Sequence, residues 1–244
     1  MNYKIYIQSL NNFPIADWAV SAYQGFRDKQ ANIIFFEDIE EVPVSKANIV
    51  VAFIEDTNKY LEKLGLPPKQ ALNIPWQLKR EAYLKRRIES CTMRIVIENN
   101  TSEHWPLFIK PDGKAKEFVA GVVKNQRDAT LYFNNIPLDT KILCSEVVDF
   151  VSEYRCYIIN GVLKGMKHYL GDPFLVPNKD KVLQMIADYT EAPAGYSLDV
   201  GILSTGETVL VECNDGWSLG NYGLDHSIYS TLLATRWREM IKGN

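Results

Sequence analysis

The first third of the chain alternates short apolar, β-branched runs with stretches of helical periodicity. The β-rich runs lie at residues 3–8, 32–36 and 49–54, and helical patterns begin near Pro14 and near Thr57. Apolar runs of this length predict strands, and a 3.6-residue period predicts amphipathic helices. We interpret the order as β-α-β-α-β, which favours a small parallel sheet and an α/β fold class.

A helix terminator follows this region. The segment Leu64-Gly-Leu-Pro-Pro ends the second helix, because glycine suits the residue after a helix and proline cannot continue one. A polar connector then leads to Pro75, where we place a domain boundary. Residues 1–74 are therefore predicted to form a small N-terminal domain.

The middle of the chain begins with a basic segment. Proline is a good first helical residue, so we expect a helix from Pro75 to about Glu89. Apolar runs at residues 105–110 and 117–123 predict two strands joined by a turn at Asp112-Gly-Lys. Residues 75–143 are predicted to form the first of two further α+β lobes.

The second half predicts two hairpins. Strands are expected at residues 142–148, 153–159 and 162–169, and Asn160-Gly161 between two β-rich runs is a strong hairpin signal. Residues 178–190 show an amphipathic helix, residues 199–214 a second hairpin, and residues 227–242 a closing helix that covers a sheet or faces a partner. Residues 144–244 are assigned to the second lobe.

Composition narrows the function. A chain of 244 residues can bury one or two cores, and a formal net charge of −3 gives it no overall basic field. The densest basic run, Lys79 to Arg87, is typical of a solvated helix face. We therefore do not expect nucleic acid as a partner. No apolar run approaches membrane-spanning length, and the N-terminus lacks a signal-peptide apolar region, so we expect a soluble, cytoplasmic protein.

The cysteines and histidines give no metal signal. No C-x-x-C pair occurs, and three of the four cysteines lie in predicted strands, so we expect reduced core thiols. These residues are Cys91, Cys144, Cys156 and Cys213. The three histidines share no metal-ligand spacing and are expected to be structural or exposed.

The hairpin of residues 199–214 carries the first chemical argument. If Thr205-Gly206 forms a two-residue turn, with glycine at a position that favours positive φ, then Ser204 pairs with Glu207. Counting outward places Asp199 directly opposite Glu212. A three-residue loop closing onto Glu207 would instead shift the register and turn Glu212 away.

Three oxygen-bearing side chains share one face under this count, because strand alternation adds Asn214 to Asp199 and Glu212. Two facing carboxylates repel unless a cation lies between them, and these oxygen ligands suit Mg²⁺ better than zinc or copper. A solvated edge hairpin is the alternative. The buried-strand run 209–211 and the glycine-rich loop 215–223, which offers backbone donors, favour the metal site.

A lysine at a strand end supplies a second signal. Lys110 ends the apolar run of residues 105–110, and Lys116 lies in the turn that follows. A lysine in this position can hold phosphate groups as a point charge. The chain contains neither a P-loop nor a Rossmann glycine motif that would bind phosphates in its place.

The order of these parts resembles the ATP-grasp superfamily. In that superfamily a lysine strand, a hinge, an acid at the hinge exit and a hairpin ending Glu-x-Asn follow one another. The strings Phe108-Ile-Lys-Pro, Ser152-Glu-Tyr-Arg, Tyr196-Ser-Leu-Asp-Val-Gly and Val211-Glu-Cys-Asn-Asp-Gly are most similar to its bacterial and phage clade labelled by an arginine-and-lysine signature. The resemblance runs from about Pro75 to the C-terminus, and it implies two α+β lobes around a nucleotide cleft.

The resemblance also implies a role for each matching residue. Lys110 would contact phosphate, backbone groups of Glu146, Val147 and Val148 would bind the adenine edge, and Glu153 would bind the ribose hydroxyls. Asp199, Glu212 and Asn214 would hold the magnesium ions that bridge the β- and γ-phosphates of ATP.

One position departs from the family pattern. Many ATP-grasp ligases carry an arginine two residues before the metal aspartate, where this chain has Ser197. Arg155 is our candidate replacement, and a structural ion pair with Glu153 is the alternative. Pairing Ile159 with Val162 would place Lys164 and His168 on the face of Arg155, with Lys167 on the other face.

The implied activity is an ATP-dependent carboxylate–amine ligase that forms an amide through an acyl phosphate, with Arg155 and Lys110 as catalytic residues. We expect the acceptor beside Trp217, Ser218 and Tyr222, in the loop that leaves the metal site. Its partners would be a small molecule or peptide with a carboxylate, and an amine. A kinase-like phosphotransferase and a non-catalytic ATP-binding module are the alternatives. The sequence leaves the substrates and the oligomeric state open.

Overall fold

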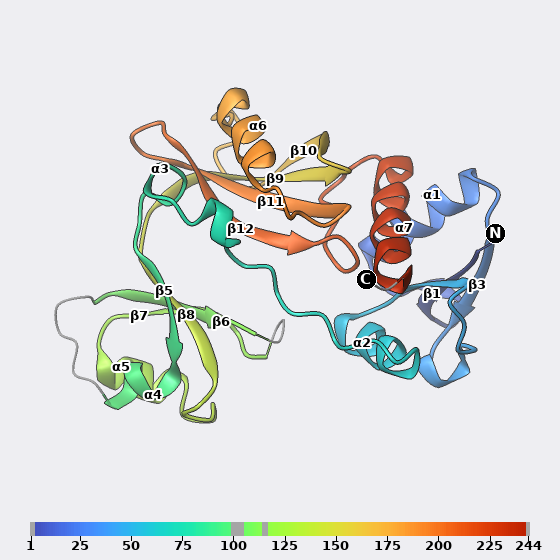
Figure 1. Cartoon of the computed structure of the whole chain (residues 1–244), viewed down its shortest axis with the longest axis horizontal. Coiled ribbons are helices and arrows are strands. Elements are labelled where there is room, and N and C mark those ends of the chain that lie inside the picture. Colours follow the sequence, from blue (N-terminus) through green and yellow to red (C-terminus); the bar gives the residue numbers. More distant parts are fainter. Residues whose placement is uncertain (1–2, 99–104, 114–116, 243–244) are drawn as a thin grey trace.

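The computed structural model describes residues 3–98, 105–113 and 117–242, and these residues form three four-stranded sheets. Figure 1 shows one sheet beside the N-terminus with α1 and α7, one beside α6, and one beside α4 and α5. This mixed architecture is the α+β fold that the sequence predicts. The domain boundaries after residues 74 and 143 stay predictions.

The N-terminal sheet is built around β1 (Lys4–Leu10), which runs parallel to β3 (Asn32–Phe36) and to β4 (Asn48–Val51). The short β2 (Phe13–Pro14) pairs antiparallel with the end of β1. Helix α1 (Asp17–Asp28) connects β1 to β3, whereas only a 3₁₀ turn, η1 (Ile39–Glu41), lies between β3 and β4. Helix α2 (Ile54–Lys63) follows β4. The expected parallel sheet is thus present, with a shorter second crossover.

The C-terminal helix α7 (His226–Lys242) covers this sheet, which is the first of the two roles expected for it. The indole of Trp237 is buried and donates to the carbonyl of Asn48 at 2.7 Å. Helices α1 and α7 approach closely at Gly25, where a Cβ would lie 2.0 Å from the carbonyl oxygen of His226. Helix α7 therefore completes the core of the N-terminal sheet.

The second sheet has the strand order β5–β8–β6–β7 and is antiparallel. Its strands are β5 (Ile88–Thr92), β6 (Leu107–Pro111), β7 (Gly121–Val123) and β8 (Lys141–Glu146). Helices α4 (Met93–Glu98) and α5 (Gln126–Tyr132) cover the face that carries Ile109 and Ile142. Lys110 lies on the opposite face, because side chains alternate along β6.

The helix expected over residues 75–89 is wrong. The segment forms a 3₁₀ turn, η2 (Trp76–Leu78), one short helix, α3 (Glu81–Leu84), and then enters β5. Lys85 adopts a left-handed conformation with φ of 50°, which ends α3. After it, burial alternates between Arg86 and Ile88 and their exposed neighbours, the two-residue period of extended chain. Tertiary burial has overridden local helix propensity here.

The third sheet has the order β10–β9–β11–β12 and is antiparallel throughout. Its strands are β9 (Phe150–Ile159), β10 (Val162–Gly171), β11 (Gly195–Leu203) and β12 (Thr208–Asp215). Helix α6 (Lys179–Asp188) packs on one face, and its buried residues join Leu198 and Leu210 in a second core. The other face carries the polar residues described below.

The helices and the cysteines also bear on expectations from the sequence. None of the described helices is both long enough and apolar enough to span a bilayer. All four cysteines are free thiols, but only Cys156 and Cys213 are buried. Cys91 and Cys144 are half-buried on neighbouring strands, with their sulfur atoms 3.4 Å apart.

Candidate active site

The β11–β12 hairpin pairs Asp199 with Glu212, as the sequence predicts, but by a different route. Leu203 closes onto Glu207 across a three-residue loop, with Gly206 at a φ of 84°. The predicted two-residue turn is therefore wrong, and Val200 pairs with Leu210. A register shift between Asp199 and Val200 then inserts one extra residue, Val211, into β12 and restores the predicted pair.

Arg86 holds this bulge in place. Its guanidinium donates to the carbonyls of Leu210 at 2.8 Å and Val211 at 3.0 Å, and to the Ser145 hydroxyl at 3.2 Å. The side chain is buried beside the ring of Phe150, and burial lowers its pKa to about 10. A guanidinium with only neutral acceptors is costly to bury unless each donor is used. Arg86 therefore links the end of β8 to the strand that carries Glu212.

Four charged side chains form one row across the third sheet. Lys167 pairs with Arg155, Arg155 with Asp199, and Asp199 with Glu212, so all four lie on the same face. Lys167 was expected on the other face, and that expectation is wrong because a bulge between Leu163 and Gly165 shifts β10 by one residue. For the same reason His168 lies opposite Tyr154 and packs against its ring.

Arg155 and Asp199 form a buried, bidentate ion pair. The guanidinium Nε donates to Oδ1 at 2.8 Å, and Nη2 donates to Oδ2 at 2.6 Å. Burial raises the pKa of Asp199 to about 6 against the opposing effect of Arg155, while the pair holds the pKa of Arg155 above its usual value. The alternative partner for Arg155, Glu153, is instead bound by the hydroxyl of Tyr169 at 2.6 Å.

Glu212 is bound by Lys110 from the second sheet. The Lys110 ammonium donates to Glu212 Oε2, which joins β6 of one lobe to β12 of the other. Burial alone would raise the pKa of Glu212, but the Lys110 charge and the Asn214 amide bring it below its usual value. Both donors favour the charged form of Glu212.

Asn214 lies between the two acids. Its amide nitrogen donates to Asp199 Oδ2 at 3.1 Å and to Glu212 Oε1 at 3.0 Å. A 180° turn of the amide would present its oxygen to the same point, where it could act as a ligand. Two carboxylates and one amide oxygen suit a hard cation such as Mg²⁺. Among the described residues, no group of three or more acidic, histidine or cysteine side chains is placed to hold a metal ion, so this trio would need water or phosphate oxygens to complete a metal shell.

The predicted adenine contacts lie where the second and third sheets join. Glu146 ends β8, and Val147 and Val148 lead into β9. The Glu146 carboxylate accepts from the backbone nitrogen of Arg87 at 2.8 Å and forms an ion pair with its guanidinium at 3.5 Å. The position fits a hinge, while contact with adenine stays a prediction. Lys116 lies outside the described residues.

The three residues predicted to contact substrate separate into two groups. Trp217 and Ser218 line a cavity of about 90 Å³ together with Trp18 and Phe53, at the carboxyl end of the N-terminal sheet. Trp217 is buried, and its indole nitrogen has no hydrogen-bond partner among the described residues. Tyr222 instead lies over Arg155, with the guanidinium carbon 4.9 Å from its ring centre.

Tyr222 also stacks on Tyr169, with ring centres 5.0 Å apart. The backbone of the same loop is held by Tyr157, whose hydroxyl donates to the carbonyl of Gly220 at 2.9 Å. The loop after β12 is thus fixed over the buried ion pair of Arg155.

Sequence reasoning missed Lys167 and Arg86. Lys167 was missed because a bulge leaves no sign in the order of residues. Arg86 was assigned to a solvated basic face, although the alternation of Leu84, Arg86 and Ile88 with charged residues is a signal for extended, half-buried chain.

Comparisons with known proteins show the family and the fold of the chain. A family model matches residues 83–232, more than half of the chain, and it describes an ATP-grasp domain, family 2 of the clade labelled by the arginine-and-lysine signature. A search of curated proteins gives no match.

Solved structures of similar fold span nearly the whole chain. D-alanine–D-alanine ligase from Bacillus anthracis has a TM-score of 0.62 at 11% identity and covers 99% of each chain, and the same enzyme has been solved with ATP. A RimK domain ATP-grasp protein from Sphaerobacter thermophilus has a TM-score of 0.57 at 14% identity, covering 95% of this chain and 100% of that one. The ATP-grasp ligase PsnB, complexed with a minimal precursor, has a TM-score of 0.55 at 11% identity, covering 96% and 100%. At these identities the likeness shows the fold.

Proposed function

Because the chain belongs to the ATP-grasp domain proteins, in family 2 of the arginine-and-lysine clade, we propose that it is an ADP-forming carboxylate–amine ligase. ATP would bind between the second and third sheets, and a carboxylate and an amine would be joined as an amide. Solved relatives of the same fold include a D-alanine–D-alanine ligase and a ligase complexed with a minimal precursor, which supports an amino acid or peptide as one substrate.

The observation that carries this proposal is the row Arg155–Asp199–Glu212 with Lys110 bound at its end. Glu212 is held by a lysine from the opposite lobe, and Asn214 bridges both acids. Asp199, Glu212 and Asn214 would hold Mg²⁺, which supplies charge neutralisation to the phosphates of bound ATP. A module that only binds the base of a nucleotide would not need this lysine, these two carboxylates and this amide together.

The chain's own cations would serve the phosphoryl group. Lys110 lies beside Glu212, where it can exchange its carboxylate partner for a phosphate oxygen. Arg155 is fixed by Asp199 and by the ring of Tyr222, so its charge is held in one place. Lys167 is the neighbour of Arg155 in the row and adds a second positive charge on the same face.

The proposed reaction has two steps. An oxygen of the substrate carboxylate attacks the γ-phosphorus, the bond from that phosphorus to the bridging oxygen breaks, and ADP leaves with the bond's electrons. The amine then attacks the acyl carbon of the resulting acyl phosphate. Inorganic phosphate departs, the amine loses a proton, and an amide remains.

The acceptor would lie near Trp217 and Ser218. Their cavity of about 90 Å³ is small and aromatic, and Trp18 of α1 and Phe53, just before α2, line it as well. The unpartnered Trp217 indole is a donor suited to a carbonyl or carboxylate oxygen. A small side chain on the substrate fits this space better than an aromatic one.

The test is a screen for ADP release with Mg-ATP across pools of amino acids and peptides, with mass spectrometry of the products. We expect steady ADP release only when a carboxylate and an amine are both present. The condensed product should be lighter than their sum by one water, about 18 Da, as amide formation requires. ADP release with a phosphorylated product and no need for an amine would establish a kinase-like enzyme instead.

A further inference from the structure

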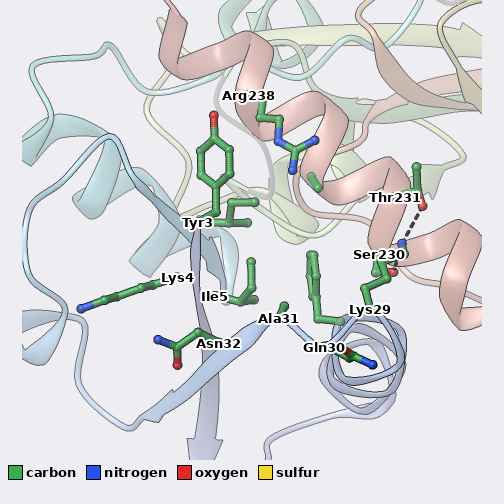
Figure 2. Close-up of a pocket in the computed structure, with 13 residues that line it drawn as sticks. Tyr3, Lys4, Ile5, Lys29, Gln30, Ala31, Asn32, Ser230, Thr231 and Arg238 are labelled. Atoms are coloured by element: carbon green, nitrogen blue, oxygen red, sulfur yellow. Dashed lines mark hydrogen bonds between the residues drawn. The ribbon is translucent and has the colours of Figure 1, made fainter. Parts of the chain in front are cut away.

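A large cavity lies beside the N-terminal sheet, away from the proposed nucleotide cleft between the second and third sheets. It has a volume of about 540 Å³ and is bounded by the amino ends of β1 and β3, the end of α1 and the middle of α7 (Figure 2). The small cavity of Trp217 and Ser218 lies at the opposite, carboxyl end of the same parallel sheet. The volume falls within the range of roughly 300–1,000 Å³ that is typical of small-molecule sites.

The charged residues that line this cavity are all basic. They are Lys4, Lys29 and Arg238, in a chain whose net charge is −3. Figure 2 shows that Lys4 extends away from the other two, whereas Arg238 descends from α7 beside Tyr3 toward the cavity. Arg238 therefore points toward this space, whereas the Lys29 ammonium lies at its margin, bound to oxygens of α7.

Lys29 has oxygen partners but no carboxylate partner among the described residues. Its ammonium donates to the carbonyl of Ser227 at 2.8 Å and to the hydroxyls of Ser230 and Thr231 at 2.6 Å each. Partial burial lowers the pKa of Lys29, Asp225 opposes this, and Arg238 lowers it further. The three acceptors use all three N–H donors of Lys29, so it contributes a positive charge to the cavity but no free donor.

Arg238 also lacks an acidic partner in the part of the chain that the structure describes. Its guanidinium carbon lies 4.8 Å from the ring centre of Tyr3, and neighbouring Glu239 is taken by Arg236 at 2.6 Å. The planar guanidinium therefore keeps its donors for a carboxylate or phosphate, which it can bind through two parallel hydrogen bonds.

The floor of the cavity is apolar. Ile5, Phe26, Ile49 and Ala234 line it, and all four belong to the buried core. A hydrated inorganic ion would not pack against this floor, whereas the apolar part of an organic anion would contact it and gain dispersion attraction.

We propose that this cavity is a second binding site, for a small organic anion whose charged group binds Arg238, near the second positive charge of Lys29, and whose apolar part lies on the floor. The site shares no residue with the proposed nucleotide cleft. Its existence does not depend on the ligase activity, so the two proposals fail separately.

Calorimetry on the full chain, without nucleotide or magnesium, tests the site with four probes: phenyl phosphate, benzoate, inorganic phosphate and benzyl alcohol. We expect phenyl phosphate or benzoate to bind at least about tenfold more tightly than both inorganic phosphate and benzyl alcohol, because only the organic anions use the charges and the floor together. Comparing the dissociation constants of phenyl phosphate and benzoate then shows whether the site prefers a phosphate or a carboxylate.

Variants locate the binding. Arg238→Gln should weaken binding by about tenfold, since it removes the two-pronged contact. Lys46→Gln, which removes an exposed charge from the same domain, should leave it unchanged, and so should Lys110→Met in the proposed cleft. Arg238 is exposed on α7, so its variant is expected to fold, and circular dichroism checks this. The proposal is overturned if neither organic anion binds, or if Lys110→Met abolishes binding and Arg238→Gln does not.

Discussion

At the scale of single residues, the buried pair of Arg155 and Asp199 shapes the site. Each group is costly to bury alone, and each has two hydrogen bonds to the other. Arg155 was proposed from the sequence as the replacement for a missing arginine at Ser197. The structure puts its guanidinium on Asp199, the proposed metal ligand, which neither sequence alternative had described.

Arg155→Gln tests the energetic weight of this pair. The change leaves Asp199 without its counter-charge, and we expect it to lower the free energy of unfolding by about 3–5 kcal/mol in urea denaturation. Arg80→Gln breaks an exposed pair with Asp188 and should cost less than about 1 kcal/mol. The double variant Arg155→Gln with Asp199→Asn should cost less than the sum of its single changes. Equal costs for Arg155→Gln and Arg80→Gln would contradict the account.

At the scale of elements, the β-bulges decide which residues face the cleft. Val211 in β12 restores the pairing of Asp199 with Glu212 after a three-residue loop, and Arg86 binds the carbonyls at that point. A second bulge in β10 brings Lys167 beside Arg155. The two bulges complete the charge row.

Arg86→Lys tests the support of the bulge. Lysine lacks the planar guanidinium and cannot donate to the Leu210 and Val211 carbonyls and the Ser145 hydroxyl together. We therefore expect a loss of about 2–3 kcal/mol in the free energy of unfolding. Arg87→Lys, at the next and more exposed position, should cost less than about 1 kcal/mol in the same urea titration. Similar losses for both variants would mean that the carbonyl contacts of Arg86 contribute little.

The sequence predicted most of the strands and hairpins, and its errors in strand register share one cause. Strand and hairpin positions followed from apolar runs and from Asn160-Gly161, and the Asp199–Glu212 pair was right. The turn at Thr205-Gly206 was wrong, and the pair was correct because the loop and the bulge each shift the register by one residue and cancel. Local sequence does not encode such bulges, since contacts from distant residues, such as Arg86, stabilise them.

At the scale of the whole molecule, the two ends of the chain form one core. Helix α7 packs on the N-terminal sheet, while Arg236 of the same helix binds Asp215 at 2.6 Å and 2.7 Å, one residue beyond Asn214. The N-terminal domain is thereby joined to the strand that carries the proposed metal ligands. Sequence periodicity predicted the helix but left its packing partner open, because an amphipathic face does not specify what it covers.

Gly25→Ala tests this contact between distant parts of the chain. A Cβ at this position would lie 2.0 Å from the backbone oxygen of His226, so α1 and α7 would have to separate. We expect a loss of about 1–3 kcal/mol in thermal or urea unfolding. Gly113→Ala is the control, since a Cβ there meets nothing within 4 Å and φ is not positive. An unchanged stability for Gly25→Ala would show that the two helices yield easily.

The central claim is that Asp199, Glu212 and Asn214 hold the magnesium of bound ATP. Isothermal titration calorimetry of ATP, with and without Mg²⁺, tests it most directly, with Glu212→Gln compared to Glu207→Gln in the same hairpin. We predict that Mg²⁺ strengthens ATP binding by at least about tenfold in the wild type and in Glu207→Gln, and that Glu212→Gln loses this gain. A Glu212→Gln variant that binds Mg-ATP as tightly as the wild type would contradict the account.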